Sequence, residues 1–401
     1  MTASLPDAEW RHRAGLDGLL DALGAADGDA RYVGGAVRDT LIGLPVSDVD
    51  VATVHDPQTV IERLERAGIK AVPTGIDHGT ITAVTAGSPV EVTTLRRDVS
   101  TDGRRATVAF TDDWREDAAR RDFTINALYA DPATGEVSDY FGGIEDLRAG
   151  RVRFIGDASA RITEDHLRIL RYFRFLARFG RGEPDSEAYG ACRAAASQLM
   201  GLSRERIADE LLKLLAVEEP VPALRLMVEG DILRAILPEV GAAGVDHVAS
   251  LQSRERDAGI APSPVRRLAA LLPRDPAIAD AVGARLKLSR RMRARLTAAL
   301  APAVDVDARA LAYHFGMESA VDRLLLDSGD LQRIGALVGW QSPDLPIGGG
   351  ALIGRGLAPG PAVAKALKAV EQQWVDEGFP DAARVGVIAD QIVSKFQRAR
   401  Q

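Results

Sequence analysis

The sequence predicts an α+β protein in which a mixed N-terminal part precedes an all-helical remainder. Up to about residue 141, short runs rich in β-branched residues alternate with segments whose apolar residues recur at helical spacing. From about residue 155 onward, helical spacing persists almost throughout, interrupted by Pro and Gly. These two patterns favour a small sheet domain followed by helical domains.

The strands expected in the mixed part follow from their β-branched content and their turn-forming neighbours. In order, they are ARYVGG, DVDVATV, GTITAVTAG, PVEVTTL and ATVAF. The segment PQTVIERLERAGI repeats its apolar residues at helical spacing and predicts a helix between the second and third strands.

The helices expected in the remainder follow from the same periodicity. They include EDHLRILRYFRFLARFG, SRERIADELLKLLAV, VPALRLMVEGDILRAIL and the segment around DARALAYHFG. We expect the Gly- and Pro-rich residues 339–363 to form a long structured turn before the last helices.

Composition limits the possible classes of protein. With 401 residues and 46% hydrophobic content, the chain can bury a real core in two to four domains. Its net charge of −7 means that any polyanion must bind a local basic surface. The single cysteine, Cys192, excludes an intrachain disulfide and a cysteine zinc cluster. No apolar run reaches the roughly 20 residues of a membrane helix, so we expect a cytoplasmic protein. No segment indicates a protein partner.

The segment GGAVRDTLIGLPVSDVDVAT combines a glycine pair with two neighbouring carboxylates. Gly34 and Gly35 follow an expected strand and precede a short helix, where backbone N–H groups can approach a phosphate. Asp48 and Asp50 alternate on the next expected strand, so both carboxylates face one side and can hold Mg²⁺. Alone, such a pair of acids is more often a solvated turn, but the glycines in front favour phosphoryl or nucleotidyl transfer.

Glu91 lies on a neighbouring expected strand between Val90 and Val92. This position allows the carboxylate to point into the same site as a third acid. An exposed strand glutamate is the alternative.

Four segments together resemble the bacterial class of tRNA nucleotidyltransferases, the CCA-adding enzymes, and their poly(A) polymerase relatives. They are GGAVRDTLIGLPVSDVDVAT, RRDFTINALYAD, DYFGGIEDLRAGRVRFIGD and RITEDHLRILRYFRFLARFG. The resemblance covers the first half of the chain and weakens beyond about residue 220. It implies a polymerase-β-like nucleotidyltransferase head with a small mixed sheet, followed by an all-α neck, body and tail.

In the resembling family, the aspartates that match Asp48 and Asp50 hold the catalytic Mg²⁺ ions. The RNA 3′-hydroxyl attacks the α-phosphate of CTP or ATP, and pyrophosphate leaves. Arg121 is then expected near the triphosphate, Asp122 on the sugar hydroxyls and Asn126 in support. The alternative for this segment is a surface helix, DFTINALYA, that the preceding charged residues cap.

The family also chooses its base with an Asp and an Arg that match Asp165 and Arg168. On one helix, these residues would share a face and present an acceptor and a planar donor to the base edge. An ordinary salt bridge between them is the alternative. Arg171 and Arg174 continue the stripe and could reach phosphate or RNA, whereas the aromatic residues between them favour a core role. The full set of expected nucleotide contacts is Gly34, Gly35, Arg38, Arg121, Asp122, Asn126, Asp165, Arg168, Arg171 and Arg174.

Two further segments bear on the RNA product. Asp102, Gly103 and Arg104 match the flexible loop that the family needs for the switch from C to A. GIDHGTITAV is similar to the tRNA enzymes rather than to the poly(A) polymerases. Arg290, Arg291, Arg293 and Arg295 are expected on one helix capped by Ser289, either as a patch that contacts the tRNA acceptor end or as a solvated face. Arg204, Glu205 and Arg206 are expected to support the base-selecting helix.

The resemblance predicts three parts: a head over 1–143, a base-selecting neck over 144–217, and a tRNA-binding body and tail over 218–401. The expected function is template-independent addition or repair of the 3′-terminal CCA of tRNA from CTP and ATP. Poly(A) synthesis and partial CC or A addition are the enzymatic alternatives. An RNA-binding protein with a relic site is the non-enzymatic alternative.

Overall fold

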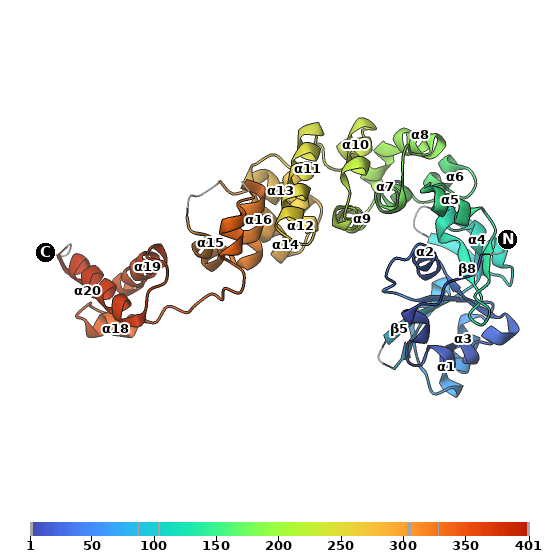
Figure 1. Cartoon of the computed structure of the whole chain (residues 1–401), viewed down its shortest axis with the longest axis horizontal. Helices are drawn as coiled ribbons and strands as arrows, with labels where there is room; N and C mark the ends of the chain where they lie inside the picture. Colours follow the sequence, from blue (N-terminus) through green and yellow to red (C-terminus); the bar gives the residue numbers. More distant parts are fainter. Residues whose placement is uncertain (1–2, 87, 103–104, 303–305, 328, 399–401) are drawn as a thin grey trace. The chain divides into compact units, whose positions relative to one another are not determined.

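The computed structural model describes residues 3–86, 88–102, 105–302, 306–327 and 329–398 (Figure 1). The chain forms two compact units, Met1–Pro238 and Glu239–Gln401. The first contains every strand of the described chain, and the second is helical. The mixed head and helical remainder expected from the sequence are therefore confirmed, while the finer boundaries at residues 143 and 217 stay predictions.

A seven-stranded mixed sheet forms the centre of the N-terminal region, with the order β3-β4-β5-β2-β1-β8-β9. Only the β2–β5 pairing is parallel, and the other neighbours are antiparallel. The strands are β1 (Ala30–Val33), β2 (Asp50–Thr53), β3 (Lys70–Gly75), β4 (Thr80–Thr85), β5 (Ser88–Thr94), β8 (Leu128–Ala130) and β9 (Val137–Asp139). A separate hairpin joins β6 (Arg96–Asp102) to β7 (Arg105–Phe110).

All five expected strands are present, but the sequence pattern missed four others. β8 and β9 have three residues each, too few for alternation to be recognised. The segment DFTINALYA, for which a capped surface helix was the alternative, forms a 3₁₀ turn at Thr124–Asn126 and then β8. The residues of β8 are all buried, so this segment belongs to the core.

Short helices cover the sheet. They are α1 (Leu16–Ala22), α2 (Gly35–Leu41), α3 (Pro57–Arg66) and α4 (Trp114–Ala119). Asp56 caps α3 because its side chain accepts a hydrogen bond from the Thr59 amide at 3.0 Å. α1 and α3 pack against β4, whereas α2 packs against β1 and β8. This placement leaves α2 against β1, the neighbour of β2, and Gly34 and Gly35 at its start line the same pocket as Asp50 of β2.

Six helices complete the first unit. They are α5 (Gly143–Ala149), α6 (Ala158–Glu164), α7 (Leu167–Phe179), α8 (Ser186–Ala194), α9 (Arg204–Ala216) and α10 (Val221–Glu229). α7 packs against α9 and α10, and its aromatic residues Tyr172, Phe173, Phe175 and Phe179 are buried. The core role expected for these aromatic residues is confirmed.

One expected helix is divided. α6 ends at Glu164, and Asp165 follows with an extended backbone (φ −151°, ψ 106°) before α7 begins at Leu167. The expectation that Asp165 and Arg168 share one helix face is therefore wrong. The Asp165 side chain accepts a hydrogen bond from the Leu167 amide at 3.1 Å, which satisfies a free donor at the start of α7.

The second unit is formed by α11 (Ala242–Asp257), α12 (Pro264–Leu271), α13 (Pro276–Arg285), α14 (Arg290–Ala299), α15 (Ala308–Phe315), α16 (Met317–Asp327), α17 (Leu331–Gly335), α18 (Gly349–Gly354), α19 (Pro361–Asp376) and α20 (Ala382–Arg398). α18 lies within the segment expected to be only a turn. Trp374 and Val370 form a buried core with Leu352 and Ile388. No helix of the described chain is long and apolar enough to cross a membrane.

Candidate active site

A pocket of about 460 Å³ in the first unit brings together most of the residues expected to bind nucleotide. We call it the central pocket. Of the expected residues, it is lined by Gly34, Gly35, Arg38, Asp50, Arg121, Asp122, Asn126, Asp165, Arg168 and Arg171. The other lining residues are Arg120, Leu167, Phe175 and Arg206. These residues come from segments separated by well over one hundred positions, so the fold assembles the site.

Gly34 and Gly35 line one side of the central pocket with backbone alone. Gly34 caps α2 with φ 70°, a conformation that L-residues with side chains rarely adopt. A Cβ at Gly34 would lie 3.6 Å from Nη1 of Arg121. That distance is an ordinary contact, so the backbone conformation of the turn, rather than crowding by Arg121, is what favours glycine here.

Arg38, which lines the same pocket, is held in place by two side chains. Its Nη1 donates to Oδ1 of Asn126 at 2.5 Å, and its Nε donates to Asp39 at 2.7 Å. The guanidinium also stacks over Phe179 at 4.3 Å. Arg38 is only 6% exposed, so its charge acts within a desolvated environment.

Asp50 and Glu91 lie side by side on the parallel strands β2 and β5. They are register partners, so both side chains project from the same face. Burial, followed by the negative charges of Glu91 and Asp48, raises the pKa of Asp50 to about 6 against the opposing effect of Arg121. Glu91 is exposed and does not line the central pocket.

Asp48 lies outside the strand on which it was expected, because β2 begins only at Asp50. Asp48 is exposed, and its Oδ2 accepts a hydrogen bond from the Ser47 hydroxyl at 2.8 Å. It therefore lies on the loop that leads into β2.

The acidic residues fit a divalent cation only in part. Within the described residues, no three His, Cys, Asp or Glu side chains form a group that could hold a metal ion. Two carboxylates are nevertheless a common protein contribution to Mg²⁺, which keeps water and substrate phosphate oxygens as its other ligands. The raised pKa of Asp50 indicates a poorly compensated carboxylate, which a cation would stabilise.

Asp117 holds two arginines of the RRD segment. Its carboxylate accepts hydrogen bonds from Nε of Arg120 at 2.8 Å and from Nη2 of Arg121 at 3.1 Å. The Tyr129 hydroxyl donates to the same carboxylate at 2.6 Å, and Arg121 Nε donates to that hydroxyl at 3.1 Å. Burial raises the pKa of Asp117, but Arg121 and Arg120 outweigh burial and hold it at about 2. The arginines are therefore fixed in position with their charge retained.

Asp122 is the centre of a second buried network. Its Oδ1 accepts from Nδ2 of Asn126 at 2.9 Å, and its Oδ2 lies 2.6 Å from Nη2 of Arg171. Burial alone would raise the pKa of Asp122, but Arg171 and Asn126 lower it below its usual value. Asp122 thus stays an acceptor inside the pocket, contrary to the alternative of a surface cap.

The two residues expected to select the base are held by different partners. Asp165 Oδ2 accepts from Nη2 of Arg206 at 2.6 Å. Arg168 Nη1 contacts the Glu164 carboxylate and donates to the backbone carbonyl of Arg161 at 3.0 Å. Asp165 and Arg168 form no ion pair with each other in the described chain, so the alternative of an ordinary salt bridge is wrong.

The sequence did not predict that Arg206 lines the pocket. We expected only a supporting role for it, but it lines the central pocket and holds Asp165 across 41 positions. Arg174, in contrast, does not line the pocket. Its Nε donates to Glu210 at 2.7 Å.

None of the four arginines of the expected basic patch lines the central pocket. Asp102 ends β6 and is the register partner of Arg105, while Gly103 and Arg104 lie outside the described residues. Ser289 caps α14 as expected, accepting from the Met292 amide at 3.3 Å. Three of the four α14 arginines form ion pairs, with their charges partly neutralised: Arg291 with Glu318, Arg293 with Asp280, and Arg295 with Asp322.

Two protein families match parts of this chain. The Poly A polymerase head domain matches residues 30–153, and the family described as the probable RNA and SrmB-binding site of polymerase A matches residues 183–243. The chain is 34% identical to the human mitochondrial CCA tRNA nucleotidyltransferase 1 over 400 residues, covering 94% of this chain and 90% of the human protein. It is 32% identical to the CCA-adding enzyme of Latilactobacillus sakei over 380 residues, covering 90% of this chain and 94% of that enzyme.

Solved structures show the same fold. The Bacillus stearothermophilus CCA-adding enzyme in complex with CTP aligns with a TM-score of 0.76 and 26% identity, over 96% of this chain and 98% of that enzyme. The Thermotoga maritima CCA-adding enzyme complexed with tRNA aligns with a TM-score of 0.68 and 21% identity, over 98% and 97% of the two chains. Both alignments span the two compact units.

Proposed function

The chain belongs to the family of CCA tRNA nucleotidyltransferases, and on this basis we propose that it adds or repairs the 3′-terminal CCA of tRNA. Its substrates would be CTP, ATP and the tRNA acceptor end. The observation that carries the proposal is the central pocket, which brings together Gly34 and Gly35, several buried or half-buried arginines, and Asp165 with Arg168 at the start of α7. A triphosphate, a ribose and a base each require one of these groups.

Asp48 and Asp50 are the residues that would hold Mg²⁺, with Glu91 as the neighbouring acid. When bound there, the metal would lower the pKa of the RNA 3′-hydroxyl and neutralise charge on the leaving pyrophosphate. Asp50 suits this role because burial has already raised its pKa to about 6, so its anion gains from a cation.

Arg121 would bind the triphosphate beside Gly34. Asp117 and Tyr129 fix its guanidinium, so little side-chain entropy is lost when a phosphate arrives. Asp122 would accept a ribose hydroxyl by sharing or exchanging one of its present donors, which are the Phe123 amide, the Asn126 side chain and the Arg171 guanidinium.

Asp165 and Arg168 would select the base. Arg206 and Glu164 hold them independently, so the acceptor and the donor fork are each oriented before a nucleotide binds. A base with the wrong edge would leave buried polar groups unpaired, which is the most selective way to reject an analogue. Template-independent choice of CTP and ATP would follow from this pair.

The helical residues 144–217 would form the base-selecting neck, and residues 218–401 the tRNA-binding body and tail. Arg290 is exposed and has no partner within the described chain, which leaves it available for phosphate. Its neighbours Arg291, Arg293 and Arg295 would contribute only by exchanging their carboxylate partners for RNA.

A primer-extension assay tests the proposal. A tRNA transcript that lacks its 3′ CCA is incubated with Mg²⁺ and labelled CTP or ATP, separately and together, and read at single-nucleotide resolution. CCA addition gives products that stop at two added nucleotides with CTP and at three with both. A long ladder with ATP alone would instead indicate poly(A) synthesis, and products that stop at two with both would indicate CC addition.

A further inference from the structure

The loop that carries Asp48 has little support of its own. Residues 44–49 have no regular secondary structure, and Asp48 and Ser47 are exposed. The loop is anchored at its start by a hydrogen bond from the Leu44 amide to the Asp39 carbonyl at 2.8 Å. At its end, Val49 is buried. The residues between these anchors determine where the Asp48 carboxylate points.

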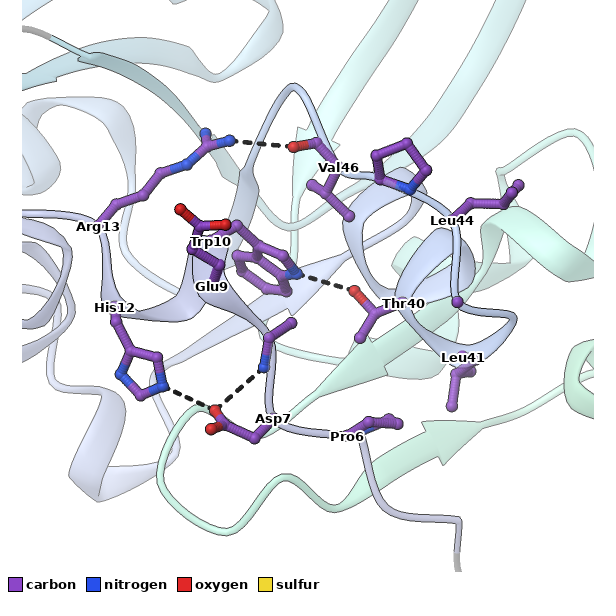
Figure 2. A pocket seen from close by; sticks show the side chains of 13 residues that line it. Pro6, Asp7, Glu9, Trp10, His12, Arg13, Thr40, Leu41, Leu44 and Val46 are labelled. Atoms are coloured by element: carbon purple, nitrogen blue, oxygen red, sulfur yellow. Dashed lines mark hydrogen bonds and ion pairs between the residues drawn. The ribbon is translucent and has the colours of Figure 1, made fainter.

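Arg13 holds the loop between these two anchors. Its Nη2 donates to the Val46 carbonyl and its Nη1 to the Ser47 carbonyl, each at 3.0 Å. Figure 2 shows the guanidinium reaching across to the Val46 carbonyl. Across the described part of the chain, no other hydrogen bond reaches the backbone of residues 45–48. Within the described residues, Arg13 forms no ion pair with a carboxylate, so the hydrogen bonds of its side chain all go to the loop.

A hollow of about 910 Å³ lies between the N-terminal segment and this loop. Figure 2 shows Trp10 between them, with its indole N–H directed at Thr40. Trp10 is 5% exposed, donates to Thr40 Oγ1 at 2.9 Å and packs edge-on against Tyr32 at 4.8 Å. The N-terminal segment is thus firmly anchored at Trp10. The loop residues Leu44 to Val46 line the hollow, so packing supports them poorly on that side.

We propose that Arg13 is a positioning residue for Asp48 and, through it, for the divalent cation. The inference rests on the proposed function. A planar guanidinium that binds two successive carbonyls fixes the backbone just before Asp48, and the Ser47 hydroxyl then bonds the carboxylate itself. Without Arg13, Asp48 would sample positions in which it cannot share a cation with Asp50. Groups that orient a metal ligand commonly change metal affinity without touching the metal.

The chain offers a matched control. Arg11 lies on the same N-terminal segment, and its Nη2 donates to the Pro132 carbonyl at 3.0 Å, away from the loop. Arg11→Ala therefore removes an anchor of the segment but leaves the Asp48 loop intact. Arg13→Lys keeps the charge but loses the fork.

The experiment compares wild-type protein with Arg13→Ala, Arg13→Lys and Arg11→Ala. Binding of Mn²⁺ in the presence of CTP is measured from the electron paramagnetic resonance signal of free Mn²⁺, without any turnover. The Mg²⁺ dependence of a single CMP addition is measured in parallel, and thermal melting reports on folding. We expect Arg13→Ala to weaken Mn²⁺ binding by about tenfold and to raise the Mg²⁺ requirement similarly, with recovery of the rate at high Mg²⁺. Arg13→Lys should be intermediate and Arg11→Ala unchanged.

Two results would overturn the inference: a folded Arg13→Ala variant that binds Mn²⁺ like the wild type, or an equal loss in Arg11→Ala. If Arg13→Ala does not fold, Arg13→Lys decides in the same way, since normal Mn²⁺ binding by it would exclude the role. A wild-type protein that adds neither CMP nor AMP would refute the proposed function instead. The Mn²⁺ comparison would still decide the role of Arg13.

Discussion

Asp122 and Arg171 form an ion pair of 2.6 Å that joins the RRD segment to helix α7. Asp122 is 8% exposed, so its charge depends on this partner and on Asn126. This pair links Asp122, which is proposed to bind the ribose, to α7, whose first turn carries the proposed base-selecting residue Arg168. Ribose binding and base selection are therefore expected to be coupled.

Replacing Arg171 tests this coupling. Arg171→Ala leaves the buried Asp122 carboxylate without its cationic partner, with only the Phe123 and Asn126 amides as donors, so we expect a loss of about 2 kcal/mol in the free energy of unfolding and a higher KM for CTP and ATP. Urea unfolding and steady-state kinetics measure both. Arg178→Ala is the control. Arg178 lies on α7 like Arg171 and forms an ion pair with Asp39 at 3.0 Å, but it does not line the central pocket. Equal KM changes in the two variants would contradict the role of Arg171.

Replacing Arg206 tests base selection. Arg206→Ala releases Asp165, whose carboxylate can then turn away from the base, so discrimination of CTP against UTP should fall by about tenfold, equivalent to one lost charged hydrogen bond. Competitive single-nucleotide addition gives the ratio of kcat/KM values. Lys213→Ala, which removes an exposed pair with Asp209 on the same helix, should change nothing. An unchanged ratio in Arg206→Ala would show that Arg206 only stabilises the fold.

The raised pKa of Asp50 makes a prediction for stability. A folded pKa of about 6, above the ordinary 3.8, means that Asp50 favours the folded state below about pH 4 and loses this contribution as pH rises through 6. Without metal at pH 7.5, Asp50→Asn should therefore melt at a higher temperature than the wild type while losing activity. Mg²⁺ with CTP should raise the melting temperature of the wild type but not of this variant.

The control for Asp50 is Asp48→Asn. Asp48 is exposed and contributes least to the raised pKa of Asp50, so its replacement should raise the metal-free melting temperature less than Asp50→Asn does. Activity should still be abolished, because Asp48 is a proposed metal ligand. Should Asp50→Asn instead lower the melting temperature at pH 7.5, Asp50 would be satisfied by the protein, and the argument for a cation would fail.

Local pattern was enough to predict much of this fold and site. Gly34 and Asp50 were recognisable because a strand, a tight turn and a short helix leave clear signals over a few residues. The mixed sheet and helical remainder followed from a change of period. The RRD residues and Asp165 were identified through their resemblance to a family, and the structure brings them into one pocket.

Long-range partners could not be predicted in this way. Arg206 and Asp165 lie 41 positions apart, and no periodicity links α9 to the end of α6. The break at Asp165 was hidden because EDHLRILRYF keeps helical spacing across it, while a side-chain hydrogen bond to the Leu167 amide ends one helix and begins another. The contacts of Arg13 with backbone carbonyls carry no sequence signal at all.

The second unit contains a buried ionic network whose loss should be costly. Asp322 is fully buried and accepts from Nε of Arg266 at 3.0 Å and from Nε of Arg295 at 2.6 Å. Because Asp322→Ala would leave both guanidinium groups short of a partner in a low dielectric, we expect it to destabilise this unit by about 3–5 kcal/mol. Urea unfolding of the full chain measures this loss. Asp280→Asn, which removes the exposed partner of Arg293 on α14, should leave stability almost unchanged. Similar unfolding curves for the two variants would mean that the Asp322 network contributes little to the stability of this unit.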